Sequence, residues 1–127
     1  MTMNIQIDFR SGVPGYNQIV EQIQHEIVSG KLRPGDQLPT VRALASDLRI
    51  NFNTVARAYR ILDEMGIIST QHGRGTFILE QPSPEVMERL RRESLEALAR
   101  RYLEETSRLG FEAGEALDQV REQMEAQ

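Results

Sequence analysis

Hydrophobic residues recur every three or four positions over most of this chain. In residues 16–29 this spacing places the apolar side chains on one face of a helix, and the polar ones on the other. The apolar positions are Tyr16, Ile19, Val20, Ile23 and Ile27. Gly30 follows, where a left-handed residue commonly ends a helix. We therefore predict a first amphipathic helix over residues 16–29.

Two further amphipathic segments, residues 41–48 and 52–65, are separated by a short turn. Thr40 and Asn51 precede them, and the side-chain oxygens of these residue types accept hydrogen bonds from the first turn of a helix. Between the first and second helices, Leu32 and Leu38 should hold the connecting loop against the core. Two short helices joined in this way predict a helix-turn-helix.

Short runs with strand character follow, at residues 67–71 and 76–79. The residues between them, His72 to Gly75, include two glycines, which supply the positive φ angles of a tight turn. The pattern predicts a β-hairpin directly after the helix-turn-helix, in the position of a wing.

A period of two also appears near the start of the chain. Ile5, Ile7 and Phe9 alternate with polar residues, which predicts a short strand with one buried face.

The third predicted helix has polar groups on the face opposite its apolar stripe. Projected at about 100° per residue, Asn53 and Arg57 lie on that face and Thr54 lies at its border. Amides and guanidinium groups read base edges, and hydroxyls contact phosphates. Because a recognition helix presents its N-terminal residues to the major groove, we predict that residues 51–57 contact DNA.

Arg42, in the first turn of the second helix, has two interpretations. It is either a solvated surface arginine or a group that points at an external anion or base edge, since a cation is unfavourable at this end of a helix. His72 and Arg74 likewise belong either to an ordinary solvated hairpin tip or to a wing that inserts Arg74 into a narrow, electronegative minor groove. The preceding helix-turn-helix favours the DNA-binding interpretation of the hairpin tip, and for Arg42 the external anion or base edge is the favoured interpretation.

The C-terminal part predicts a hinge at residues 81–84, then helices over about 85–108 and 112–124, joined near Gly110. Their apolar positions form a seam that a two-helix hairpin alone cannot bury. The seam comprises Leu95, Leu98, Tyr102, Leu109, Phe111, Leu117 and Val120. We expect the same hairpin of a second copy to cover it; the alternative is that it packs on its own N-terminal domain.

Composition adds limits to this picture. The 127 residues suffice for one ordinary domain or a small domain with an appendage, and the absence of cysteine excludes disulfides and thiolate metal sites. No signal peptide or membrane span is expected, which suits a cytoplasmic protein. Residues 1–80 carry eight basic and eight acidic residues, whereas residues 81–127 carry seven and eleven. The net charge of −4 is therefore located in the tail and does not argue against nucleic-acid binding.

Catalytic patterns are missing from the sequence. There are two histidines, and no phosphate-binding loop, zinc-protease motif or nucleophile elbow. We expect no enzymatic activity, no cofactor and no metal. The competing interpretation is a winged helix that binds protein or RNA without operator specificity, a class that tends to lose the amide and cationic groups kept here on the third helix.

Residues 16–77 resemble the winged helix-turn-helix of the GntR family of bacterial transcription regulators. The resemblance is carried by the motifs PG at 34–35, LPTVRALA at 38–45, NFNTVARAYRILDEMGII at 51–68 and HGRGTF at 72–77. The remaining tail is too short for the sensor domains of larger members, and it resembles that of the YtrA subfamily.

The resemblance implies a mostly α, α+β fold with a winged helix-turn-helix domain at residues 1–80, the hinge at 81–84 and a helical dimerisation tail at 85–127. It also implies a homodimeric repressor that binds a palindromic double-stranded operator; a small-molecule effector of unspecified identity is a further hypothesis, which the sequence leaves open. We expect an effector pocket at the junction of tail and winged domain, or between subunits.

Family members place DNA contacts at positions that match Arg42, Asn51, Asn53, Thr54, His72 and Gly73. Arg57 and Arg74 are added from the helix projection and the chemistry of the wing. Many relatives have proline at the position of Phe52, so the recognised DNA sequence does not transfer from them. Phe52 either contacts a thymine methyl group or covers the turn.

Overall fold

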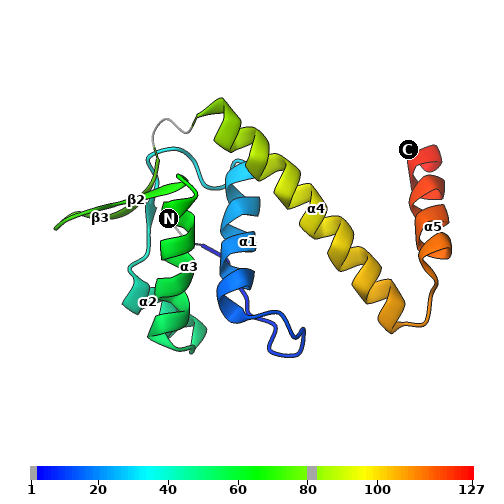
Figure 1. Ribbon diagram of the computed structural model, residues 1–127, viewed down its shortest axis with the longest axis horizontal. Coiled ribbons are helices and arrows are strands. Elements are labelled where there is room, and N and C mark those ends of the chain that lie inside the picture. The colour runs from blue at the N-terminus through cyan, green and yellow to red at the C-terminus, as the bar shows by residue number, and fades with distance from the viewer. Residues whose placement is uncertain (1–2, 80–82) are drawn as a thin grey trace. The chain divides into compact units, whose positions relative to one another are not determined.

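The computed structural model describes residues 3–79 and 83–127. The elements are α1 (Gly15–Val28), β1 (Gln37–Leu38), α2 (Val41–Leu48), α3 (Phe52–Glu64), β2 (Ile68–Gln71), β3 (Gly75–Ile78), α4 (Pro84–Arg108) and α5 (Ala113–Ala126) (Figure 1). The strands form a three-stranded antiparallel sheet in the order β1-β3-β2. The predicted class, α+β and mostly α, is confirmed.

The chain divides into two compact units, residues 1–94 and residues 95–127, and α4 begins in the first and ends in the second. The core of the first unit includes Leu90, with Val86 and Met87 packed against it. This core therefore extends into α4, past residue 80, where the sequence prediction ended the domain. Most of the predicted hinge lies outside the described residues, so a bend at 81–84 stays a prediction.

The helix-turn-helix forms as its sequence predicts. The Thr40 hydroxyl accepts a hydrogen bond from the Ala43 N–H (3.0 Å), and the Asn51 side-chain oxygen accepts one from the Asn53 N–H (2.7 Å). Between the two helices Arg49 adopts a left-handed conformation with φ 56°, which ends α2 and turns the chain into α3. Both predicted caps are confirmed.

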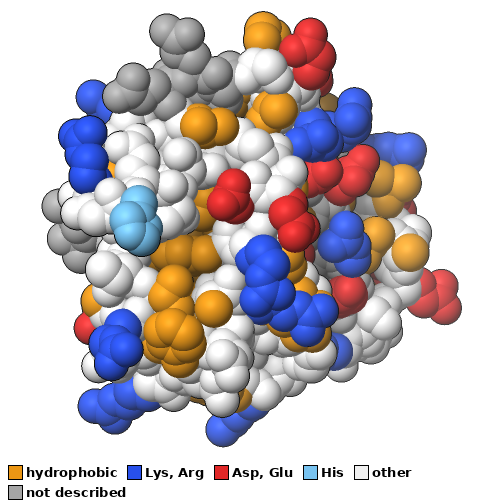
Figure 2. Space-filling model, turned by 60° about the vertical axis from the view of Figure 1, so that its left-hand side comes forward, with side chains coloured by type: hydrophobic (Ala, Val, Ile, Leu, Met, Phe, Trp, Pro, Cys, Tyr) orange, Lys and Arg blue, Asp and Glu red, His pale blue; other side chains and the backbone are white. Residues whose placement is uncertain are grey.

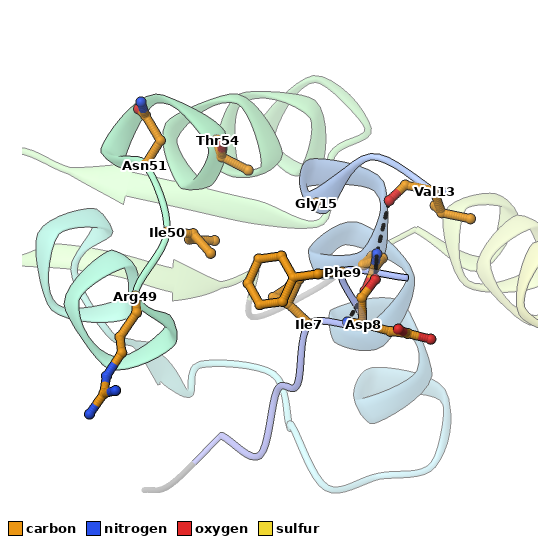
Figure 3. A pocket seen from close by; sticks show the side chains of 10 residues that line it. Ile7, Asp8, Phe9, Val13, Gly15, Arg49, Ile50, Asn51 and Thr54 are labelled. Carbon is orange, nitrogen blue, oxygen red and sulfur yellow. Dashed lines mark hydrogen bonds between the residues drawn. The ribbon is translucent and has the colours of Figure 1, made fainter. Parts of the chain in front are cut away.

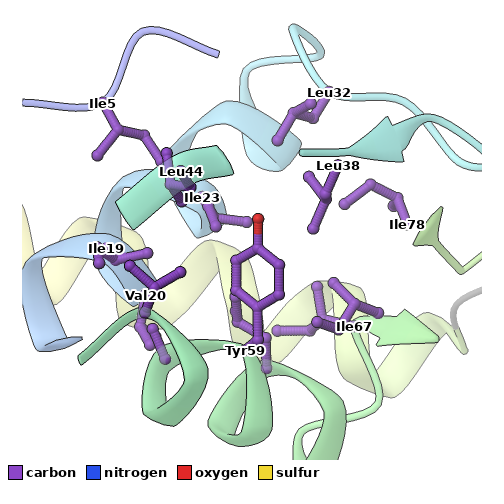
Figure 4. Close-up of a cluster of buried hydrophobic side chains, with 14 of the residues drawn as sticks. Ile5, Ile19, Val20, Ile23, Leu32, Leu38, Leu44, Tyr59, Ile67 and Ile78 are labelled. Atoms are coloured by element: carbon purple, nitrogen blue, oxygen red, sulfur yellow. The ribbon is translucent and has the colours of Figure 1, made fainter. Parts of the chain in front are cut away.

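The core of the first unit lies between α1, α2, α3 and the sheet (Figure 4). The inner face of α3 has no solvent contact, since Val55, Ala58 and Leu62 are completely buried. Leu32 and Leu38 are also buried, which confirms that they hold the loop after α1 against the core.

The hydroxyl group of Tyr59 lies among the apolar side chains of the core (Figure 4). This hydroxyl donates to the carbonyl oxygen of Pro39 at 2.7 Å, just before the start of α2. Burial raises the pKa of Tyr59 above its ordinary value, because the ionised form would lose its hydration. The hydrogen bond thus connects α3 to the segment just before α2.

The wing contains a strand that the sequence analysis missed. β1 pairs with β3, Gln37 opposite Phe77, and its two residues are too short to show a period of two. The Gln37 side-chain amide donates to the Arg74 carbonyl oxygen at 3.2 Å. Gly75 has φ 120°, which favours glycine, and a Cβ atom there would lie 2.6 Å from that amide nitrogen and displace the Gln37 side chain.

The predicted strand at residues 5–9 is wrong. Residues 3–8 form no strand, and two glutamines of α1 occupy the place of a neighbouring strand. Gln22 accepts from the Gln6 N–H (3.0 Å) and donates to the Gln6 carbonyl (2.7 Å), and Gln18 makes the same pair of bonds with Asp8 (2.8 and 3.0 Å). A side-chain amide has one acceptor and two donors, so it can replace a backbone peptide group. The alternating pattern signalled an extended backbone without a β partner.

The second unit consists of the end of α4 and α5, which Gly110 separates with φ 91°. At the other end of α4, in the first unit, the Ser83 side chain accepts a hydrogen bond from the Val86 N–H (3.1 Å). The helix starts at Pro84, close to the predicted start near residue 85. The Tyr102 hydroxyl donates to the Ala116 carbonyl (2.9 Å). Most of the predicted seam is exposed: Leu95, Leu98, Leu109, Phe111, Leu117 and Val120, with Tyr102 half-buried.

Within residues 3–79 and 83–127, no helix is long and apolar enough to cross a membrane.

We expect Tyr59→Phe to destabilise the first unit by about 1–2 kcal/mol, because it leaves the buried Pro39 carbonyl without its donor. Urea denaturation at neutral pH measures this loss. The same variant has a distinctive pH response. The folded state holds the Tyr59 proton to a higher pH than the unfolded state does, so the stabilisation is complete below about pH 10 and is lost as the pH rises further. Wild type should therefore lose stability above pH 10 more steeply than Tyr59→Phe; parallel curves for the two proteins would contradict this account.

Candidate nucleic-acid interface

The predicted DNA-contacting residues all lie in the first unit, on α2, α3 and the wing. The exposed ones are Arg42, Asn51, Asn53, Arg57, His72, Gly73 and Arg74, and Thr54 is half-buried. The projection of α3 is confirmed, with Asn53 and Arg57 on its free face and Thr54 at its border. The structure gathers Asn51, Asn53 and Thr54 on the first turn of α3 and places the wing residues on a separate hairpin.

The first turns of α2 and α3 have the electrostatic character of an anion-binding surface. Neither turn contains a carboxylate, so the positive ends of the two helix dipoles are not neutralised. Arg42 adds an exposed side chain with a guanidinium group to the first turn of α2. The acidic residues of α3, Asp63 and Glu64, lie at its other end.

Asn51 has two roles available at the start of α3. Its side-chain oxygen is used by the cap on the Asn53 N–H. The cap does not use the side-chain nitrogen, which can still donate to an external acceptor. Asn53 lies two residues further along and is exposed.

The wing presents a thin, braced tip. Gly73 adopts φ 77° in the turn, and the Arg74 N–H donates to the Gln71 carbonyl at 2.9 Å. The brace from Gln37 to the Arg74 carbonyl holds the same turn from the β1 side. Figure 1 shows the hairpin extending beyond α2 and α3, so its tip reaches away from the core. In the view of Figure 2, a histidine lies near the left edge of the molecule, with basic side chains above and below it and an apolar patch beside it.

An open pocket of about 330 Å³ lies beside the start of α3 (Figure 3). One wall is the N-terminal segment, where the Phe9 ring faces Ile50, and the other includes Asn51 and Thr54. The sequence gives no sign of this pocket, because the alternation at residues 5–9 predicts a strand. The pocket belongs to the first unit, and the expected effector site at the junction or between subunits stays a prediction.

Two contacts of this interface were also missed. The Arg57 guanidinium carbon lies 3.9 Å from the centre of the Tyr16 ring, although Tyr16 was assigned only to the apolar stripe of its helix. A Cβ on Gly15 would lie 3.2 Å from the Thr54 methyl group, so glycine lets the first turns of α1 and α3 approach closely. Neither contact has a local sequence signal, since both join residues far apart in the chain. Among the described residues, no cluster of His, Cys, Asp and Glu could hold a metal ion.

Comparison with known proteins agrees with this arrangement. The family model for bacterial regulatory proteins of the gntR family matches residues 15–78, which cover α1, the helix-turn-helix and the wing. The chain is 46% identical over 84 residues to the HTH-type transcriptional repressor YtrA of Bacillus subtilis, which is 66% of this chain and 65% of YtrA. It is 36% identical over 115 residues to the HTH-type transcriptional regulator YhcF of the same organism, covering 89% of this chain and 92% of YhcF.

Solved structures show the same fold. A GntR family transcriptional regulator from Listeria monocytogenes has a TM-score of 0.66 and 35% identity, over 90% of this chain and 98% of that one. AraR(DBD) in complex with operator ORX1 has a TM-score of 0.53 and 25% identity, over 61% of this chain and 98% of that one. The chain therefore belongs to the GntR family of bacterial regulatory proteins, as a helix-turn-helix transcription regulator similar to YtrA.

Proposed function

We propose that this chain is a homodimeric repressor that binds a palindromic operator, with α3 in the major groove and the wing in the minor groove. The observation that carries the proposal is the start of α3, where Asn51 and Asn53 are exposed and Thr54 is half-buried, in a turn without a carboxylate. The similarity to the repressor YtrA and to AraR(DBD), which was solved with its operator, supports the same function.

The groups divide into two roles by their chemistry. Asn53 suits bidentate reading of adenine, and Arg42 suits guanine or phosphate. Thr54 is half-buried and offers a short hydroxyl, which suits a backbone phosphate. At the wing, Gly73 keeps the tip thin, and His72 and Arg74 supply cationic or donor groups for a narrow minor groove.

Dimerisation is proposed through the tail. Leu95 and Leu109 are 69% and 76% exposed, and such apolar side chains repeat along both α4 and α5. A second copy offers the same seam, so one self-complementary interface could cover both. The symmetry would place two copies of α3 about one DNA turn, or a multiple, apart. An effector would act by changing the angle between the two winged domains.

The proposal is tested by measuring operator affinity against salt, on a duplex selected from random oligonucleotides. We expect log affinity to fall linearly with log salt, by about 0.9 for each phosphate neutralised. Arg42→Ala should weaken operator binding by roughly 1–3 kcal/mol if Arg42 contacts a base bidentately, and binding to unrelated duplexes much less. Lys31→Ala is the matched control. It also removes one exposed positive charge, but at a position after the C-terminal end of α1.

Two results would sort the alternatives. Affinity that does not change with salt would reject DNA binding and favour the protein-interaction module. An equal loss by Arg42→Ala on every duplex would assign Arg42 to a phosphate instead of a base.

A contact between Phe52 and a thymine methyl group can be tested by removing that methyl group alone. Phe52 is 49% exposed and is the first residue of α3, between Asn51 and Asn53, so part of its surface is open to DNA. We expect one operator thymine to contact it. Replacing that thymine with uracil removes only the methyl group and should weaken binding about fourfold, the equivalent of one buried CH₂. The difference should vanish in Phe52→Ala. If no thymine position shows this coupling, Phe52 has no role in reading DNA.

The dimer is tested by placing a charge in the seam. Because Leu98 and Leu109 are exposed in the single chain, Leu98→Asp and Leu109→Asp should leave the first unit folded while they separate the subunits. Light scattering should give twice the 14.5 kDa chain mass for wild type and a single chain mass for the variants. Gln119→Asp, an exposed polar site on α5, is the control and should stay dimeric. A wild-type monomer at micromolar concentration, on or off DNA, would reject the dimer.

A further inference from the structure

The contact between Arg57 and Tyr16 changes the role expected of Arg57. The guanidinium group leaves the free face of α3 and stacks on the Tyr16 ring in the first turn of α1, 3.9 Å from the ring centre. Arginine over an aromatic face is an attractive arrangement, through both the ring quadrupole and planar stacking. The side chain therefore has a preferred position before any DNA is bound.

Close packing of α1 against α3 makes this stack possible. Gly15, immediately before Tyr16, faces Thr54 so closely that a Cβ would lie 3.2 Å from the threonine methyl. Arg57 follows Thr54 by three residues, so it lies on the same side of α3, one turn further along. The first turn of α1 therefore packs against the side of α3 on which Thr54 and Arg57 lie.

The stack leaves the hydrogen-bonding edge of the guanidinium available. A cation–π contact does not require any of the five guanidinium N–H groups as hydrogen-bond donors, so they can donate to an external acceptor. Within residues 3–79 and 83–127, no ion pair joins Arg57 to a carboxylate. The group combines a fixed position, a full charge and unused donors, which is the chemistry that binds a phosphate.

Position along α3 separates Arg57 from the base-reading residues. Asn53 lies on the first turn, which enters the groove deepest, while Arg57 lies on the second turn and is drawn sideways onto α1. Phosphates line the edges of the groove, where a residue displaced to the flank of the recognition helix would meet them.

We propose that Tyr16 is a positioning residue that holds Arg57 against a DNA backbone phosphate, so that Arg57 supplies affinity without sequence discrimination. This inference rests on the DNA-binding function proposed above. The stack reduces the side-chain entropy lost on binding, since the guanidinium is already placed.

The test is a double-mutant cycle of Tyr16 and Arg57, with fluorescence anisotropy on the selected operator and on an unrelated duplex. Arg57→Ala should weaken both duplexes by a similar factor and make the salt slope less negative by about 0.9 per half-site. Tyr16→Leu, which keeps an apolar side chain but removes the ring, should weaken binding roughly two- to fivefold, the worth of an exposed cation–π contact. Tyr16→Phe keeps the ring and should bind like wild type. In the Arg57→Ala background, Tyr16→Leu should have no further effect.

Thermal unfolding of each variant accompanies the binding data. An equal loss from Tyr16→Leu with and without Arg57 would overturn the proposal, because Tyr16 would then act through the stability of α1. Binding by Tyr16→Phe as weak as by Tyr16→Leu would assign the contact to the hydroxyl group and also overturn it. A change in the selected sequence for Arg57→Ala would make Arg57 a base reader. Failure of the wild type to bind any duplex would instead reject DNA binding itself.

Discussion

Complete burial of one face of α3 is the constraint on which the rest of the molecule depends. A recognition helix can offer a fixed set of polar groups only if its other side cannot rotate or slide. Here Val55, Ala58 and Leu62 have no solvent contact, and the Tyr59 hydroxyl is bonded to the Pro39 carbonyl ahead of α2. The apolar contacts supply the energy, and the directional hydrogen bond sets the position of α3 along its axis. The place of Asn53 on the outer face is therefore set by residues of the core.

The same helix is fixed from the N-terminal side by α1, and the N-terminal segment is fixed by α1 in turn. Gln18 and Gln22 lie one helical turn apart and each replaces a peptide group toward an alternate residue of that segment. The device anchors an extended backbone without a neighbouring strand. The anchored segment also forms one wall of the pocket beside Asn51 and Thr54.

The sequence predicted what depends on local chemistry and missed what depends on distant contacts. Caps at Thr40 and Asn51, and the alternation of buried and exposed positions on α3, follow from neighbours within a few residues, and all of them are confirmed. The failed strand at residues 5–9 shows the limit, because a period of two reports an extended backbone and not its partner. β1 was missed because its two residues pair only with β3, far along the chain. The stack of Arg57 on Tyr16 has the same origin, and a helix projection can show that Arg57 is outside without showing what it meets. The proposed roles on DNA go beyond what either the sequence or the fold establishes.

The second unit, residues 95–127, buries far fewer large apolar side chains than the first unit does. Within residues 95–127, the buried side chains are those of Ala97 and Ala116, while large apolar side chains remain in contact with water. Burying two alanines contributes far less than the conformational entropy lost in ordering two helices, which is about 1–2 kcal/mol per residue for the backbone alone. The glutamate capping box of α5 and the bond from Tyr102 to Ala116 each contribute about 1 kcal/mol, so they cannot close that gap. A unit of this size is stable only if it buries its seam elsewhere. Under the proposed dimer, ordering of the tail and association of the subunits become one equilibrium, and the concentration of the protein then sets how much of it can bind an operator as a pair.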